Sequence, residues 1–580
     1  MSGHSIEPGA TALALAPAKA AGFISRRLAP AVVWATTALL ALSIGIYLWR
    51  FEVEGADFLF AGGVTLTLGA LIIAASRRPL LAAVLVTAMV AIIRTASYVK
   101  QQATEMVLHA YDVVSLLSSW TALADLWNDH RRYAIALLLA LIATAIVGWI
   151  AYRIDGVRVP RAYAAVAALM LVCVAWAGAA AKGERRHTEL YFESLYVSFF
   201  YASWSETAQA LWRRRLIEAA DQVQVPGLAG PGRCEPASKP PHVVLIHQES
   251  VVPPAHFRTL DYDRGLDPFF QSADGKLRKL RVETYGGASW RSEFSLLTGL
   301  STQSFGGMRQ FVQPFMAGKI QDTLPQALAR CGYRTMLLYP MLRNFLASWK
   351  FFERAGLGEI RDAKDQGAKL PNERDRFYYA NALAEMKLHL QTSSKPLFMY
   401  IQTMATHGSY DYAYMPEVVV PGGGRGTHPE MHEYLRRLAM AHMDYRFLRA
   451  ELSRRFPDQQ FLVVHYGDHQ PTATRMLLGF GEDASIEDVM IGGNPAALTT
   501  YYALDAVRYR LPPLAAMETM DIAYLGTMLL EAARLPLSDA YRERRRLMLL
   551  CNGRYYDCPA QDEILKFHRR LIDARLLEPS

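Results

Sequence analysis

The sequence predicts a multi-pass α-helical membrane domain followed by an α/β domain with a mostly parallel central sheet. The 580-residue chain is too long for one compact domain, and 52% of its residues are hydrophobic. The hydrophobic excess is concentrated before residue 182. From residue 242 onward, short apolar runs alternate with helical stretches, a pattern typical of an α/β sandwich.

The first third of the chain contains five apolar stretches that we expect to cross a membrane. Each has about 20 residues, enough for a hydrocarbon core of about 30 Å. A cleaved signal peptide is an alternative for the first, but four further spans follow it, which favours an uncleaved helix. The predicted spans are 30–49, 58–76, 79–98, 133–152 and 161–181.

The loops between these spans differ in charge, which predicts their orientation. One set of alternate loops is basic and contains Arg26, Arg27, Arg77, Arg78, Arg153, Arg158 and Arg161. The other set is acidic and contains Glu52, Glu54, Asp57, Glu105, Asp112, Asp125 and Asp129. The positive-inside rule then places the N-terminus in the cytoplasm and exports everything after residue 182. Arginines beside the spans also account for the net charge of +8, so we expect no nucleic-acid partner.

Amphipathic segments connect the predicted spans to the exported part. Residues 99–132 have helical apolar spacing and predict one interfacial helix, with Val107, Ala110, Val114, Leu117 and Trp120 on its apolar face. Residues 183–222 predict one or two amphipathic helices rich in aromatic residues, and 225–241 is a linker rich in Pro and Gly. The resulting domains are a five-span domain at 1–182, a connector at 183–240 and an exported domain at 241–580.

Four apolar runs in the exported part predict buried parallel strands: "HVVLIHQ", "YRTMLLYP", "PLFMYIQTM" and "QFLVVHY". We expect helices at 322–331, 373–390 and 429–455. Sites in such folds collect at the carboxyl ends of strands. Three of the four runs end in polar candidates, which are Glu249, His407 and the pair Asp468-His469.

Ser289 lies in "ETYGGASWRSEF", where a glycine-rich turn leads into a helix. Free N–H groups at a helix N-terminus favour a phosphate there and stabilise an alkoxide. The alternative is a serine that only caps the helix. The proline that formylglycine formation requires in sulfatases is missing after Ser289, which argues against that chemistry.

Glu249 is either a metal ligand or the cap of the next loop. Asp468 and His469 are adjacent donors after a buried strand, a combination that suits Mn, Mg or Zn, with a solvated turn as the alternative. His407 is either structural or a residue that binds phosphate or protonates a leaving oxygen.

Other patterns have simpler readings. His428 and His432 are spaced like helical metal ligands but lack a protease glutamate, so we expect an exposed helix start. "PGGGRG" at 421–426 is a loop. Cys173 lies in the fifth span and predicts inert packing. "CNGRYYDC" could close a small disulfide loop between Cys551 and Cys558, whereas the pairing of Cys234 and Cys331 stays open.

Taken together, the spans, the aromatic connector and four motifs resemble one family. The motifs are "ES", "GGASWRSEF…LTG", "ATHGSY" and "YGDHQP". They resemble the lipoteichoic-acid-synthase-like phosphoglycerol transferases of the alkaline phosphatase superfamily, which have a sulfatase-like fold and stand alongside phosphoethanolamine transferases. The resemblance covers nearly the whole chain.

The resemblance implies roles for particular residues. One divalent metal, commonly manganese with zinc or magnesium as alternatives, would bind Glu249, Ser289, Asp468 and His469. Ser289 would be the nucleophile, although the Gram-positive synthases have Thr there. His407 would contact the donor phosphoryl group. A family stretch that contributes Trp and Arg to the donor pocket is shorter here, and its counterparts would be Trp349, Arg354 and Lys350.

The resemblance also implies an activity. The chain would move a phosphoglycerol headgroup from a phospholipid donor, phosphatidylglycerol, through Ser289 to an extracytoplasmic glycan or polymer. With phosphatidylethanolamine as the donor, the transferred headgroup would be phosphoethanolamine. It would do so from the bacterial cytoplasmic (inner) membrane. The alternatives are a phosphoethanolamine transferase, a phosphodiesterase that uses water, and a non-enzymatic membrane scaffold.

Overall fold

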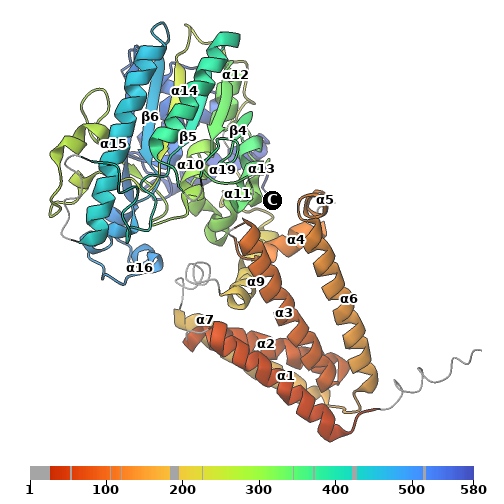
Figure 1. The fold of residues 1–580 in the computed structure, drawn as a ribbon. Helices are drawn as coiled ribbons and strands as arrows, with labels where there is room; N and C mark the ends of the chain where they lie inside the picture. The colour runs from red at the N-terminus through yellow and green to blue at the C-terminus, as the bar shows by residue number, and fades with distance from the viewer. Residues whose placement is uncertain are drawn as a thin grey trace, which may run out of the picture. The chain divides into compact units, whose positions relative to one another are not determined.

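The computed structural model describes residues 27–52, 55–104, 106–118, 120–182, 195–224, 226–343, 345–369, 372–420, 428–513 and 517–579. The chain divides into two compact units (Figure 1). The first contains residues 1–102 and 106–205, and the second contains 103–105 and 206–580. The domain boundaries drawn from the sequence stay a prediction.

Five helices of the first unit are long and apolar enough to cross a membrane, as the sequence predicts. Each overlaps one of the predicted stretches. They are α1 (Pro30–Phe51), α2 (Gly55–Ser76), α3 (Pro79–Thr104), α6 (Arg131–Ile154) and α7 (Arg161–Lys182).

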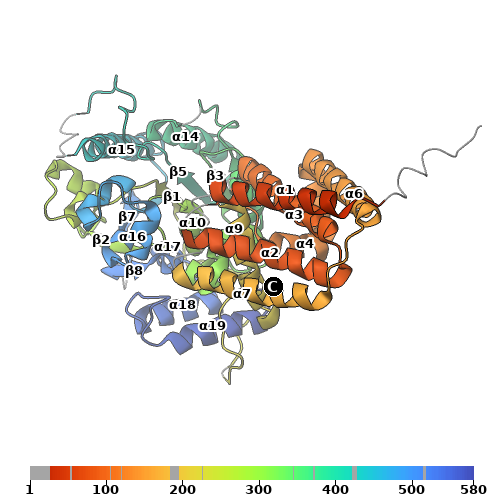
Figure 2. The same ribbon diagram turned by 90° about the horizontal axis from the view of Figure 1, so that it is seen from below.

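Helices α2 and α7 lie side by side (Figures 1 and 2). Glycines allow their backbones to approach closely. A Cβ atom on Gly63 would lie 2.8 Å from the backbone nitrogen of Ala175, and one on Gly178 would lie 2.7 Å from that of Phe60. Small residues at contact points are typical of helices that pack inside a membrane.

The arginine-rich loops of the first unit meet at one end of its helices. Arg78 donates to the backbone carbonyl of Asp155 at 3.0 Å. The Asp155 carboxylate in turn accepts from the backbone N–H of Leu80 at 2.9 Å, within the first turn of α3. The loop between α2 and α3 is therefore joined to the loop between α6 and α7, which agrees with the predicted grouping of basic loops.

The single interfacial helix predicted at 99–132 is wrong. Helix α3 extends to Thr104 and is followed by two short helices, α4 (Ala110–Ser118) and α5 (Trp120–Asp129). The Asp112 carboxylate explains the break, since it accepts from the backbone N–H of His109 at 2.8 Å and from Lys100 at 2.6 Å. These bonds give α4 its own N-terminus. The connector forms helix α9 (Tyr196–Arg213), and residues 183–194 lie outside the described residues.

The second unit contains an eight-stranded sheet in the order β4-β3-β5-β1-β6-β7-β2-β8. All strands run parallel except β7, which is antiparallel to both β6 and β2. The predicted mostly parallel sheet is therefore confirmed. The strands are β1 (His242–Gln248), β2 (Arg278–Arg281), β3 (Arg334–Leu338), β4 (Glu359–Arg361), β5 (Leu397–Gln402), β6 (Phe461–Gly467), β7 (Thr499–Val507) and β8 (Thr519–Asp521).

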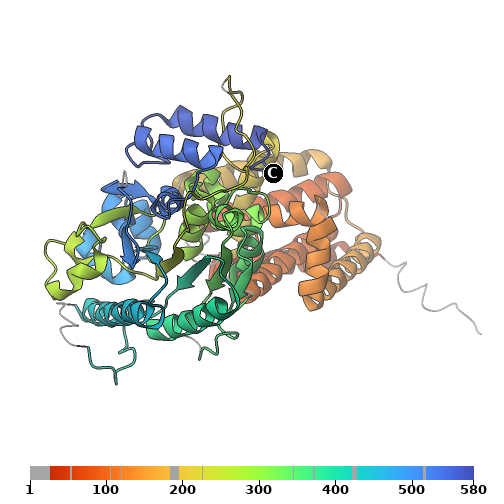
Figure 3. The ribbon, with the colours of Figure 1, turned by 90° about the horizontal axis from the view of Figure 1, so that it is seen from above.

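Helices cover both faces of this sheet (Figure 3). On one face, Val244 and Ile246 of β1 pack into a buried core with Leu383 and Leu438 from two long helices. These helices, α14 (Asp375–Thr392) and α15 (Pro429–Arg455), match two predicted ranges, and α12 (Leu324–Arg330) matches the third. His428 is the N-cap of α15, which confirms the simpler reading of the His428/His432 pair. "PGGGRG" lies outside the described residues.

Two disulfides stabilise the second unit. Cys551 and Cys558 close the small loop suggested by the sequence, with an S–S distance of 2.03 Å. Cys234 bonds to Cys331 across 97 positions and ties the linker to the end of α12. In the first unit, Cys173 is a free cysteine whose side chain is exposed on α7, and its inert role in the fifth span stays a prediction.

Candidate active site

The sheet order brings the carboxyl ends of β1 and β6 together. The two strands pair in parallel, with Gln248 opposite Gly467, so Glu249 and Asp468 leave the sheet side by side. Strand β5 flanks β1 on its other edge and leads into the loop that carries His407. Three of the predicted candidates therefore lie at one edge of the sheet.

Ser289 reaches the same place from helix α10 (Ser289–Thr298). The N-cap of α10 is Ala288, which has a left-handed φ of 62°, and Ser289 is the first helical residue with no side-chain capping bond. The Ser289 hydroxyl instead donates to Glu249 Oε2 at 3.1 Å and lies 3.3 Å from His469 Nε2. The alternative that Ser289 only caps the helix is therefore wrong.

The four residues predicted for the metal site converge. His469 Nε2 lies 3.2 Å from Glu249 Oε1 and 3.3 Å from Asp468 Oδ2. The side chains of Glu249, Asp468 and His469 are buried, so this is not the solvated turn that the sequence left open.

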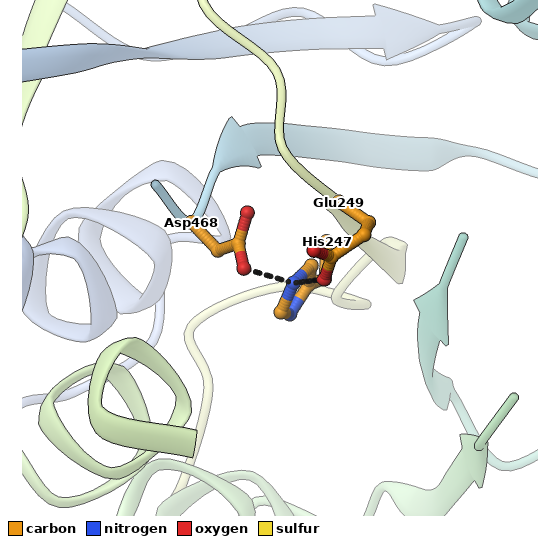
Figure 4. Close-up of side chains that lie close together, drawn as sticks. All are labelled: His247, Glu249 and Asp468. Atoms are coloured by element: carbon orange, nitrogen blue, oxygen red, sulfur yellow. Dashed lines mark ion pairs between the residues drawn. The ribbon is translucent and has the colours of Figure 1, made fainter. Parts of the chain in front are cut away.

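Sequence reasoning missed a fifth member of the cluster, His247. Its Nε2 atom lies 3.1 Å from Asp468 Oδ2 and 3.4 Å from Glu249 Oε2 (Figure 4). Successive residues of a strand point to opposite faces, so His247 and Glu249, two residues apart, are directed to the same side. This spacing was the available signal. His247, Glu249 and Asp468 offer ligand atoms within 4.8 Å of one another.

The cluster fits a cation. His247 Nε2 and Asp468 Oδ2 are both buried and lie 3.1 Å apart, yet neither atom makes a hydrogen bond of good geometry, although buried polar atoms are almost always hydrogen-bonded. Burial alone would lower the pKa of His247 and His469, but the Asp468 carboxylate raises the first well above its ordinary range and the second to about 9. The carboxylates thus require positive charge beside them. Nitrogen and oxygen donors of this kind hold zinc or manganese.

Neighbouring groups fix the two carboxylates. The backbone N–H of Ser250 donates to Asp468 Oδ1 at 2.8 Å, and the Ser250 hydroxyl donates to Glu249 Oε1 at 2.9 Å. The Ser292 hydroxyl donates to the Asp468 carbonyl at 2.6 Å. Thr406, in the loop after β5, donates to the Glu249 carbonyl. Such supporting bonds orient the donor atoms of a metal site.

His407 is exposed beside this cluster and acts electrostatically on Glu249. Its loop is held by Arg437 of α15, which is 0% exposed. Arg437 donates to the backbone carbonyls of His407 at 2.7 Å and Ser409 at 2.8 Å. The hydrogen bonds from Arg437 therefore fix the backbone of the loop that carries His407.

The remaining predicted residues lie on helix α13 (Ser348–Arg354). The Trp349 indole donates to Glu353 at 2.5 Å, and the Arg343 guanidinium stacks 3.6 Å from the Trp349 ring centroid. Lys350 and Arg354 are exposed. In the described chain, the contacts of Trp349 and Arg354 do not reach the metal cluster.

A buried chain of hydrogen bonds does connect α13 to α10. The Ser348 hydroxyl donates to Gln313, whose Nε2 donates to Glu293 Oε2 at 2.9 Å. Gln402, the last residue of β5, donates to the other Glu293 oxygen at 3.1 Å. Burial raises the pKa of Glu293 to about 7. Sequence reasoning did not single out Glu293 as a site residue, although it lies one turn after Ser289.

Parts of the chain are similar to known proteins. A Haemophilus influenzae protein described as uncharacterized is 24% identical over 242 residues, which are 40% of this chain and 41% of that protein. The phosphoglycerol transferase GacH of Streptococcus pyogenes has a TM-score of 0.46 at 16% identity, over 60% of this chain and 88% of GacH. The phosphoethanolamine transferase EptA of Neisseria meningitidis has a TM-score of 0.43 at 13% identity, over 88% of this chain and 97% of EptA.

The family model that matches the chain is Sulfatase, over residues 241–512. The matched segment begins just before β1 and ends just after β7, so it contains the strands that build the site. Glu249, Ser289, Asp468, His469 and the additional His247 all lie within it. The segment 241–512 of the chain therefore matches the Sulfatase family model, and five helices long and apolar enough to cross a membrane precede it.

Proposed function

We propose that this protein is a membrane-anchored, metal-dependent transferase. It moves a phosphoglycerol headgroup from a phospholipid to an extracytoplasmic glycan or polymer through a covalent intermediate on Ser289. The observation that carries this proposal is the position of the Ser289 hydroxyl. It lies at the start of a helix, 3.1 Å from a carboxylate and 3.3 Å from an imidazole, and does not cap the helix.

In this proposal, Glu249, Asp468, His469 and the Ser289 oxygen hold one divalent cation, with His247 as a further donor. Manganese is the proposed ion, with zinc and magnesium as alternatives. A bound cation would lower the pKa of the serine hydroxyl and offset the charge of a phosphate. The N-terminus of α10 adds free N–H groups on the side where a phosphate oxygen would lie.

The transfer proceeds in two balanced steps. Ser289 Oγ attacks the phosphorus atom of the donor and gives its proton to the carboxylate–imidazole cluster. The bond from phosphorus to the diacylglycerol oxygen breaks, and that oxygen takes a proton, for which His407 is the proposed donor. An acceptor hydroxyl then attacks the phosphorus atom and gives its proton to His407. The bond from phosphorus to Ser289 Oγ breaks, and that oxygen recovers its proton from the cluster.

Trp349, Lys350 and Arg354 are proposed to bind the donor headgroup. Their helix begins at Ser348, which is joined to α10 through Gln313 and Glu293. A partly buried tryptophan and two exposed cations suit a headgroup that carries a phosphate.

A phosphoethanolamine transferase would use the same residues and remains the first alternative. The metal cluster would contact the phosphate group of the donor and not the rest of its headgroup. A phosphodiesterase differs only in accepting water. A non-enzymatic scaffold is disfavoured, since it would have no use for five converging donor groups in a buried cluster.

A covalent adduct on Ser289 is the first expected result. When the full-length protein is incubated with phosphatidylglycerol and phosphatidylethanolamine together, the Ser289 peptide should gain the mass of phosphoglycerol. Mass spectrometry of the digested protein measures this directly. A gain of phosphoethanolamine would select the first alternative. No adduct on Ser289, under conditions in which diacylglycerol is released, would exclude the covalent route.

We further propose that the enzyme lies in a bacterial cytoplasmic membrane with its sulfatase-family domain on the periplasmic side. This orientation rests on the grouping of arginines at one end of the apolar helices. A phosphatase reporter fused after residue 240 should therefore be active, and a cytoplasm-dependent reporter at the same position should be silent. The reverse pattern would contradict both the orientation and access to an extracytoplasmic acceptor.

A further inference from the structure

Helix α3 carries an arginine inside its apolar span. The span covers Pro79–Gln102, and Arg94 lies about 22 Å along the helix from Pro79 and about 12 Å before Gln102, at 1.5 Å per residue. Pro79 follows Arg77 and Arg78, so Arg94 is nearer the membrane face opposite the arginine-rich loops. Charged residues inside apolar spans are costly, and they are retained where they have a function.

The protein gives Arg94 aromatic neighbours but no counter-charge. The Arg94 guanidinium lies 5.2 Å from the centroid of the Tyr98 ring and beside the Tyr47 hydroxyl, and its charge acts on Tyr196. Within the part of the chain that the structure describes, no carboxylate forms an ion pair with it. The Arg94 side chain is exposed on the surface of α3, where lipid would surround it.

Glu52, an acidic residue whose charge also acts on Tyr196, already has hydrogen-bond partners. Glu52, which is 1% exposed, accepts from the backbone N–H groups of Val197 and Ser198 at 3.0 Å each. It also accepts from the Tyr47 hydroxyl at 3.3 Å. By contrast, Lys100, one and a half turns further along α3, is paired with Asp112 at 2.6 Å. Arg94 therefore differs from the neighbouring cation in lacking an acidic partner within the described chain.

We propose that Arg94 binds the phosphate of a membrane phospholipid, in the leaflet opposite the arginine-rich loops. A guanidinium matches a phosphate through two parallel hydrogen bonds, and the long arginine side chain can extend from the apolar span toward the headgroup phosphates of the nearer membrane face. The tyrosines suit the same boundary, since their rings favour the headgroup level. This binding site shares no residue with the metal cluster, and the proposal does not rest on the proposed transferase activity.

Lipid binding by the full-length protein in a neutral detergent tests this proposal. Native mass spectrometry would count bound phosphatidylglycerol across a titration, with diacylglycerol as the phosphate-free lipid. Beyond the copy held as donor at the metal cluster, we expect wild type to bind one further phosphatidylglycerol more tightly than diacylglycerol. Arg94→Gln should weaken that binding by roughly tenfold to a hundredfold, the loss expected for a charge-assisted contact. Arg94→Lys should weaken it less.

Arg132 provides the matched control. It is an exposed arginine near the start of α6, at the end of an apolar span instead of inside one, so Arg132→Gln should leave the tight site unchanged. Added sn-glycerol phosphate should not displace the lipid if the bound species is a lipid headgroup. Displacement would point to a free phosphate as the ligand and overturn the lipid assignment. Equal binding of phosphatidylglycerol and diacylglycerol by wild type, or unchanged binding by Arg94→Gln, would also overturn the proposal.

Discussion

Replacing Ser289 by alanine should reduce headgroup transfer by at least about a thousandfold while the protein remains folded. The hydroxyl makes no capping bond, so its loss does not release the start of α10. What disappears is the oxygen that lies between Glu249 and His469. The measurement is release of diacylglycerol from labelled phosphatidylglycerol, with phosphatidylethanolamine run in parallel.

Two further variants of α10 make this result specific. Ser289→Thr keeps the hydroxyl and should retain turnover. Ser295→Ala removes another buried serine hydroxyl of the same helix, one that donates to Glu283 at 3.0 Å. It should cost about 1 kcal/mol of stability and leave transfer largely intact. If Ser289→Ala releases diacylglycerol at a near-normal rate on the lipid that wild type uses, Ser289 is not the nucleophile.

The central part of the sheet could be predicted because its strands are buried on both faces. β1, β3, β5 and β6 are mostly apolar, and these nearly continuous apolar runs stand out against the helices between them. The other strands carry weaker signals. β4 has three residues and β8 has three, and the four residues of β2 include three cations. Strand β7 is long enough to have been found, but its antiparallel pairing depends on contacts with β6 and β2 that the sequence does not reveal.

Some residues of the candidate site could likewise be predicted from the sequence, and one could not. Glu249, Asp468 and His469 were predictable because each follows an apolar run, and the parallel pairing of β1 with β6 then brings them together. His247 was missed because it lies inside such a run, where a histidine gives no signal that distinguishes a metal ligand from an ordinary strand residue. Its role depends on Asp468, which is 221 positions away in the sequence and 3.1 Å away in space.

The disulfides and the proposed headgroup residues also differ in how far the local sequence could predict them. The bond between Cys551 and Cys558 closes over a short turn and was suggested locally, whereas Cys234 meets Cys331 only because the linker folds back on the domain. Trp349 and Arg354 were placed by resemblance alone, and their described contacts do not extend to the metal cluster.

Replacing Asp468 by asparagine should weaken binding of the divalent cation by at least roughly a hundredfold, because losing even a supporting residue around a metal typically costs ten- to a hundredfold. Asparagine keeps the shape of the side chain and the oxygen that accepts from Ser250. It removes the negative charge beside His247 and His469. The Oδ2 atom of Asp468 is then no longer available as a charged ligand for a cation. Elemental analysis of the purified protein should find one Mn, Zn or Mg per wild-type chain and little in the variant.

Thermal unfolding provides an independent measurement of the loss of cation binding in Asp468→Asn. A ligand that binds only the folded state raises the melting temperature with its concentration, so added Mn²⁺ or Zn²⁺ should stabilise metal-stripped wild type and not Asp468→Asn. Asp375→Asn is the matched control. Asp375 is also a fully buried aspartate, and it accepts from the backbone N–H of Ala405 at 2.9 Å but lies outside the cluster. Burial, together with Asp444, raises its pKa to about 7, so an amide resembles its protonated form. Asp375→Asn should keep both the metal and the metal-dependent stabilisation. Equal metal content in wild type and Asp468→Asn would show that the cluster is held together by its own protons and not by a cation.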